Sequence, residues 1–205
     1  MNRKTLAAAV IVPLLLGVSA VDAAPKKKPA PKPVCNLVTD AKGDATDTGG
    51  TGAKAPNDPN LDILRADIAT NATTLTALIG LSALDDSENS SHTGRSYVVT
   101  FTAQGKTVTV RGITSPAGDK WADGNGTGTV DKAAKQVRIH VPLAKLSEMA
   151  QLPQPMKAGV KVTGISASTW RWVGTTEATL GIVDRATGAG PGYTLGYPSC
   201  VKVGA

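Results

Sequence analysis

The chain has 205 residues, of which 41% are hydrophobic and 3% aromatic, and its formal net charge is +6. Of its 22 basic and 16 acidic residues, six basic and one acidic lie in residues 1–33, which leaves 16 basic and 15 acidic residues in the remainder. A nearly neutral domain lacks the basic face that binding to a phosphate backbone requires, and a nucleic-acid partner is therefore excluded.

Residues 1–23 have the three parts of a secretory signal peptide. A short basic start precedes the apolar run Leu6–Ala20, and Val21-Asp22-Ala23 places small or apolar residues where signal peptidase cuts. The alternative is a transmembrane anchor, which needs about 20 apolar residues. Pro13 interrupts the run and an acid ends it. We expect cleavage and export, with no transmembrane segment in the mature chain and a secreted, extracellular location.

Residues 24–33, APKKKPAPKP, form a tether by composition. Proline favours extended backbone and neighbouring lysines repel one another, so the segment should be extended and solvated. The tether is a solubilising spacer, or it draws the protein to an anionic cell surface, where each lysine contributes about 1 kcal/mol. Residues 34–205 have the length of one domain.

Two cysteines stand near the ends of this domain, Cys35 and Cys200. In an exported protein an even cysteine count indicates a disulfide, which would bring both termini of the domain to one place. Closing so long a loop stabilises the fold by on the order of 5 kcal/mol. A catalytic dithiol would need a C-x-x-C pair, and the chain has none.

Short alternating runs of apolar and polar residues, separated by turn residues, predict an all-β fold, an antiparallel sandwich of two sheets. Asn71 and Gly105 mark the turns of two hairpins. Leu143–Leu152 follows Pro142 with three-residue apolar spacing and predicts one short helix. Thr39–Asn60 has no periodicity and should be a long loop. The predicted strands are Leu61–Ala69, Thr73–Ile79, Ser96–Thr102, Thr107–Ile113, Gly128–Val130, Gln136–Val141 and Val160–Val173.

Four stretches occur in an order that resembles a known group. They are LDILRADIATNATTLTALIGL, GRSYVVTFTAQGKTVTV, QVRIHVPLAKL and the closing YTLGYPSCV. Together they resemble a poorly characterised group of secreted bacterial β-sandwich domains, similar to DOMON-like domains and family 9 carbohydrate-binding modules. The resemblance covers most of residues 35–201 and implies the sandwich. Relatives of such sandwiches bind sugars, haem or calcium, or have no known ligand, so the resemblance does not fix a function.

Aspartates gather in the early loop and at its entry to the first long strand. Calcium takes six to eight oxygen ligands, and carboxylates on a flexible, glycine-rich loop are suitable donors. The alternative is that these aspartates are ordinary turn residues. The candidate calcium ligands are Asp40, Asp44, Asp47, Asp58 and Asp62.

Trp170 and Trp172 alternate along the last long strand, so their side chains should lie on one face about 7 Å apart. An aromatic ring can cover the apolar face of a pyranose, and this pair is a candidate sugar platform. The alternative is that both rings cover the core or an edge of the sheet. A cell-surface polymer or polysaccharide is the candidate partner.

Catalytic residues are scarce. His92 and His140 are the only near-neutral bases, and neither has a serine or cysteine nucleophile beside it in the sequence. Gly164-Ile165-Ser166 begins like a nucleophile elbow, but Ser168 stands where the second glycine belongs. We expect a secreted, non-catalytic binding or structural module. A carbohydrate-binding or calcium-stabilised module is the alternative, followed by an unrecognised hydrolase.

Overall fold

The structure is a computed structural model that describes residues 30–46, 58–85, 94–115, 118–172 and 179–203. For residues 172 and 179–181 it describes the backbone alone. The predicted signal peptide and most of the predicted tether lie outside the described residues. The segment Pro31–Ala205 forms one compact unit.

One antiparallel sheet has the strand order β1-β2-β3-β8-β7. The β2–β3 hairpin turns at Asn71 as predicted, because the Asn71 Oδ1 atom accepts hydrogen bonds from the backbone N–H groups of Thr73 (2.9 Å) and Thr74 (2.8 Å). Its strands are β1 (Val38–Thr39), β2 (Ile63–Thr70), β3 (Thr74–Leu81), β7 (Thr127–Asp131) and β8 (Gln136–Pro142).

The second sheet has the order β10-β9-β4-β5-β6, and β11 pairs with β9. The β4–β5 hairpin turns at Gln104 (φ 51°) and Gly105 (φ 76°), which matches the tight turn predicted at Gly105. Its strands are β4 (Gly94–Ala103), β5 (Lys106–Thr114), β6 (Lys120–Trp121), β9 (Lys161–Trp172), β10 (Thr179–Thr187) and β11 (Tyr193–Thr194).

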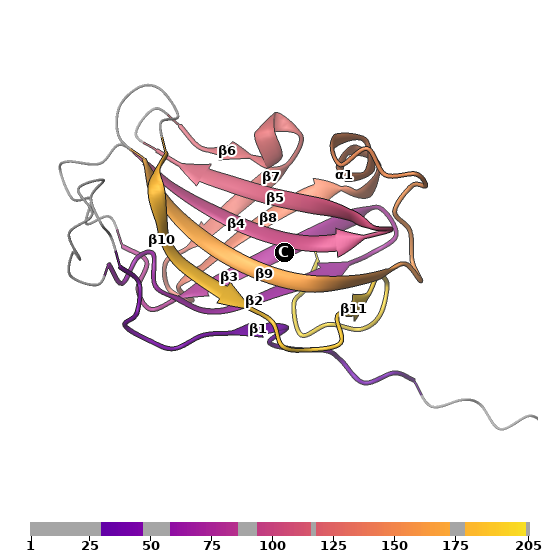
Figure 1. Cartoon of the computed structure of the whole chain (residues 1–205), viewed down its shortest axis with the longest axis horizontal. Helices are drawn as coiled ribbons and strands as arrows, with labels where there is room; N and C mark the ends of the chain where they lie inside the picture. The colour runs from indigo at the N-terminus through magenta and orange to yellow at the C-terminus, as the bar shows by residue number, and fades with distance from the viewer. Residues whose placement is uncertain (1–29, 47–57, 86–93, 116–117, 173–178, 204–205) are drawn as a thin grey trace, which may run out of the picture. The chain divides into compact units, whose positions relative to one another are not determined.

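The two sheets face each other across an apolar core, with β9, β4 and β5 in front of β2, β3 and β8 in Figure 1. Alternation along each strand sends one set of side chains inward. This buried cluster includes Val137, Ile139 and Val141 of β8 and Val99 and Phe101 of β4. The predicted β-sandwich is confirmed.

The predicted helix is also present, as α1 (Leu143–Met149), which begins directly after Pro142. Leu143 and Leu146 are buried on its inner side. A one-turn 3-10 element, η1 (Ala122–Gly124), joins β6 to β7. No helix in the described residues is long and apolar enough to cross a membrane.

Trp121 closes the gap between neighbouring strands of the two sheets. Its ring lies against Gly112 of β5 and Gly128 of β7, and a Cβ at either glycine would collide with the indole. These two glycines therefore make room for one large side chain, which packs on the core rather than standing free on a surface.

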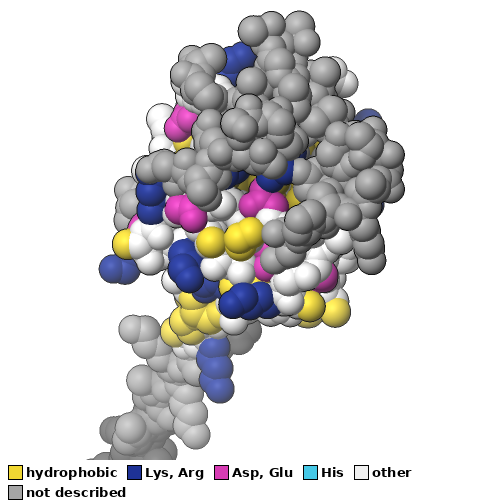
Figure 2. Space-filling view, turned by 90° about the vertical axis from the view of Figure 1, so that its left-hand side faces the viewer, with side chains coloured by type: hydrophobic (Ala, Val, Ile, Leu, Met, Phe, Trp, Pro, Cys, Tyr) yellow, Lys and Arg dark blue, Asp and Glu magenta, His cyan; other side chains and the backbone are white. Residues whose placement is uncertain are grey.

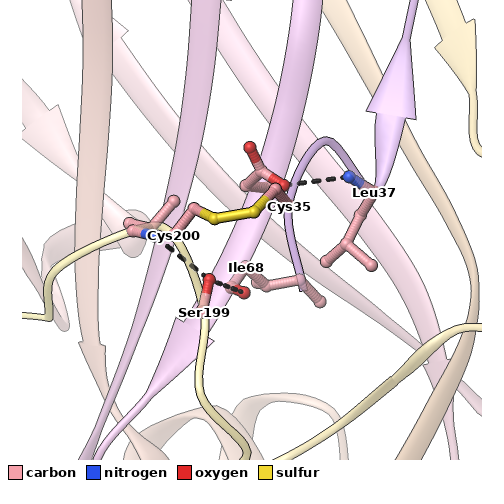
Figure 3. The surroundings of a disulfide bond; sticks show 7 residues. Cys35, Leu37, Ile68, Ser199 and Cys200 are labelled. Atoms are coloured by element: carbon pink, nitrogen blue, oxygen red, sulfur yellow. Dashed lines mark hydrogen bonds between the residues drawn. A yellow bond between two sulfur atoms is a disulfide. The ribbon is translucent and has the colours of Figure 1, made fainter. Parts of the chain in front are cut away.

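Cys35 and Cys200 form a disulfide, with their Cα atoms 5.2 Å apart, as the sequence predicts. Beside it the two ends of the domain run parallel, and the Cys200 N–H donates to the Val34 carbonyl (3.1 Å). Figure 3 shows the hydrogen bonds that join both ends of the domain to β2. The Leu37 N–H donates to the Asp67 carboxylate (2.9 Å) and the Ser199 hydroxyl donates to the Ile68 carbonyl (3.4 Å).

Candidate functional site

A groove of about 560 Å³ crosses the outer face of the sheet that contains β9, the face turned toward the viewer in Figure 1. Its volume lies within the range of about 300–1,000 Å³ that is typical of ligand sites. Strands β4, β5, β9 and β10 all contribute to it. The described lining residues are Ser96, Val98, Thr100, Thr109, Arg111, Gly164, Ser166, Ala167, Ser168, Trp170, Arg185 and Thr187.

Strand register arranges these side chains in rows across the sheet. Arg185 of β10 is opposite Ser168 of β9, which is opposite Val98 of β4, which is opposite Arg111 of β5. A second row, shifted by two residues, consists of Thr187, Ser166, Thr100 and Thr109. Three strand spacings separate the two arginine backbones, or about 14 Å. The arginines therefore stand at opposite walls of the groove, and small side chains form its floor.

Trp170 lines the groove next to this floor. Its side chain is half-buried, and the indole Nε1–H donates to the Ser168 hydroxyl (2.9 Å), which fixes the orientation of the ring. Ser96 of β4 is opposite Trp170 in the sheet. Trp172 lies two residues along the same strand, and its side chain is outside the described residues. The pairing of the two rings as one platform stays a prediction.

The charged groups of the groove are cationic. Arg111 Nε and Nη2 donate to Asp123 Oδ1 at 3.2 and 2.6 Å, and the Asp123 side chain is 51% exposed. Arg185 is exposed, and within the part of the chain that the structure describes its guanidinium makes no hydrogen bond or ion pair. No described lining residue is acidic. On the side of the molecule in Figure 2, by contrast, acidic and basic side chains are interspersed.

A second group of polar side chains, the acidic cluster, consists of Asp40, Asp44 and Asp184. One carboxylate oxygen from each lies within 4.8 Å of the others. Asp184 is nearly fully buried and accepts hydrogen bonds from the backbone N–H groups of Ile63 (2.7 Å) and Arg185 (2.6 Å). The Asp40 Oδ2 atom is buried and has no hydrogen-bond partner among the described residues.

Burial and mutual repulsion disturb the ionisation of this cluster. Burial is the main cause that raises the pKa of Asp184 to about 6, and the charges of Asp40 and Asp44 add to it against the two backbone hydrogen bonds. The pKa of Asp40 is raised as well, first by burial and then by Asp44 and Asp62. Three carboxylates so close together have the oxygen donors that a divalent cation prefers.

The remaining candidate calcium ligands have separate roles. Both oxygens of the buried Asp62 carboxylate accept the Gly43 N–H, at 3.0 and 2.9 Å, which holds the loop that carries Asp40 and Asp44. Asp58 forms an ion pair with Arg171, and both side chains are largely buried, at 11% and 7% exposure. Burial lowers the pKa of Arg171. Asp47 lies outside the described residues, and calcium binding stays a prediction.

Of the two histidines, His92 lies outside the described residues. His140 is half-buried on the outer face of β8, where its Nδ1 atom is 2.8 Å from the Thr76 hydroxyl. Burial and then the charge of Arg138 lower the pKa of His140. Thr76 is fully buried, so its hydroxyl does not meet a substrate, and the pair lies on the sheet opposite the groove.

Comparison with known proteins assigns no family: no protein-family model matches the chain, and no curated protein matches it. The resemblance to DOMON-like domains and family 9 carbohydrate-binding modules therefore stays a prediction.

Sequence reasoning did not find Arg111, Arg185 or Asp184. Arg111 occupies a polar position of an alternating strand, and nothing in the sequence distinguishes it from an ordinary exposed residue there. The other two belong to β10, whose pairing with β9 shifts register between Thr179 and Gly181 and again between Ile182 and Asp184. Such irregularities break the two-residue period by which a strand is recognised.

Proposed function

We propose that this protein is a secreted, non-catalytic binding module that holds a polysaccharide in the groove across β10, β9, β4 and β5. The observation that carries the proposal is the composition of the groove: one oriented indole beside a floor of hydroxyl-bearing side chains.

Each part suits a pyranose. The Trp170 ring offers an apolar face to the apolar face of a sugar. The hydroxyl groups of Ser166, Ser168 and Thr100 both donate and accept hydrogen bonds, as sugar hydroxyls require. Because the groove lies on the face of a sheet rather than inside the sandwich, a polymer can lie across it without entering the core.

Binding without hydrolysis is supported by the groups that line the groove. Glycoside hydrolysis ordinarily uses a pair of carboxyl groups on either side of the bond that breaks. The described lining residues include no aspartate, glutamate, histidine or cysteine. His140, with its lowered pKa, lies on the other sheet.

A location outside the cytoplasm is supported by two features. Residues 1–23 have the pattern of a cleavable signal, and the Cys35–Cys200 disulfide is of the kind that persists in oxidising compartments. The Pro/Lys-rich residues 24–33 would then be a solubilising spacer or attract the domain to an anionic surface.

The test is the affinity of the chain without residues 1–23 for a panel of neutral and acidic polysaccharides, measured by affinity electrophoresis. We expect Trp170→Ala to weaken binding about tenfold, the loss of one aromatic contact. Tyr197→Ala is the matched control, since Tyr197 is an exposed aromatic residue (48%) outside the groove lining. Binding by Trp170→Ala equal to the wild type, or no binding to any member of the panel, contradicts the proposal.

A further inference from the structure

We infer that the groove selects acidic polysaccharides, whose uronate carboxylates bind between Arg111 and Arg185; this inference rests on the proposed polysaccharide binding. It concerns the two walls of the groove, whereas the proposal above depends on the indole and the hydroxyl floor.

The geometry comes from one row of the sheet. Arg185 and Arg111 end a row whose middle positions are Ser168 and Val98. Neither middle side chain is long enough to separate the two guanidinium groups. Arginine side chains are long and flexible, so from backbones about 14 Å apart both can reach over the floor toward one ligand.

The donors suit a carboxylate. A guanidinium is a planar fork of five N–H groups that matches the two oxygens of a carboxylate. Arg185 is exposed, and its guanidinium makes no hydrogen bond or ion pair with a described residue. The Nε and Nη2 groups of Arg111 donate hydrogen bonds to Asp123, a residue of η1, the element that joins β6 to β7. That ion pair shows that the Arg111 guanidinium can bind a carboxylate.

The charges that line the groove predict a negatively charged ligand. No described lining residue is acidic, and two arginines line the groove, so the described lining favours an anionic ligand such as a uronate. Asp123, which is outside the described lining, pairs with Arg111 and partly neutralises it. A neutral sugar would leave Arg185 with water alone, and a cationic ligand would be repelled. The hydroxyl groups of the floor and the Trp170 ring bind the sugar ring, and the two arginines bind its carboxylate.

The experiment compares polygalacturonate and alginate with their methyl esters, which keep the polymer backbone and remove the charge. Isothermal titration is carried out with the wild type, Arg185→Gln and Lys202→Gln. Lys202 is the matched control because it is exposed and follows Val201, which packs on Ala69 and Leu78 of the opposite sheet. Polyglutamate serves as a polyanion without sugar rings.

We expect the wild type to bind at least one free acid about tenfold or more tighter than its ester, the effect of one charge-assisted hydrogen-bonded pair. Arg185→Gln should bring the two affinities together, and Lys202→Gln should leave them apart. Asp123→Asn should raise the affinity for the acid several-fold, since it removes the negative charge that pairs with Arg111. Asparagine tolerates the φ of 52° at position 123.

The two claims fail in different ways. Equal binding of acid and ester by the wild type overturns the acid selectivity and leaves polysaccharide binding standing. Loss of affinity in Lys202→Gln as large as in Arg185→Gln, or polyglutamate binding equal to that of the uronates, also overturns the inference, because net charge alone would then explain it. No binding of any polymer in either form contradicts the proposed function itself.

Discussion

Raising the pH from about 4 to about 7 is expected to lower the free energy of unfolding of the metal-free domain by about 3 kcal/mol through Asp184. Its pKa is about 6 in the folded protein, against an ordinary value of 3.8. A difference of about 2 units corresponds to about 3 kcal/mol. Below 3.8 the carboxyl is protonated in both states. As the pH rises through 6 the folded state gives up a proton that it held more tightly than the unfolded chain, and stability falls.

The assay is urea unfolding followed by tryptophan fluorescence in the presence of chelator, for the wild type and Asp184→Asn. Asparagine is neutral at every pH. Its amide faces a backbone N–H of Ile63 or Arg185, which should lower stability by about 1 kcal/mol independently of pH. The difference between the two proteins should therefore change by about 3 kcal/mol across the range. Asp119→Asn, an exposed residue outside the acidic cluster, serves as the control.

A difference in stability between the wild type and Asp184→Asn that is constant from about pH 4 to about pH 7 refutes this reasoning. It would mean that the carboxylates of the acidic cluster are as well solvated in the folded protein as in the unfolded chain, or that a cation accompanies them even in chelator.

Calcium should raise the Tm at neutral pH and not near pH 4, where Asp184, with its pKa of about 6, is protonated; the same Tm in calcium and in chelator at neutral pH contradicts the calcium prediction. Replacing Cys35 and Cys200 together with alanine should lower the free energy of unfolding by on the order of 5 kcal/mol in urea, and an unchanged midpoint would show that the cross-link does not limit the unfolded chain. Asp58→Ala should destabilise by about 3 kcal/mol because it removes the carboxylate from the buried Arg171; a loss no larger than that of a surface substitution would argue that the pair is solvated.

Local alternation made most of the sandwich predictable. β2 and β3 form a hairpin at Asn71, and β4 and β5 form one at Gly105, because apolar alternation and turn chemistry agree at these places. The disulfide was predictable because the chain has only two cysteines and the pattern of a signal peptide at residues 1–23. Two-residue strands such as β1 and β6 carry too little pattern to be recognised, and the bulges of β10 break the period.

The candidate site was predictable only in part. Trp170 and the aspartates of the early loop stand out by residue type. The acidic cluster is completed by a residue far along the chain, since Asp184 meets Ile63 across 121 positions. The row from Arg185 to Arg111 depends on the register of four strands, and it includes the pairing of β9 with β4, which are far apart in the sequence. Contacts of this kind are fixed by the tertiary fold, and no local pattern indicates them.

Binding at the groove is tested most directly by mapping backbone amide chemical shifts during titration with the polysaccharide fragment that binds tightest. We expect the largest shifts at Ser166, Ser168 and Trp170 of β9 and at their neighbours in β4, β5 and β10, with the amides of β3 and β8 unchanged. Shifts concentrated on β3 and β8, or at the loop of the acidic cluster, would contradict it.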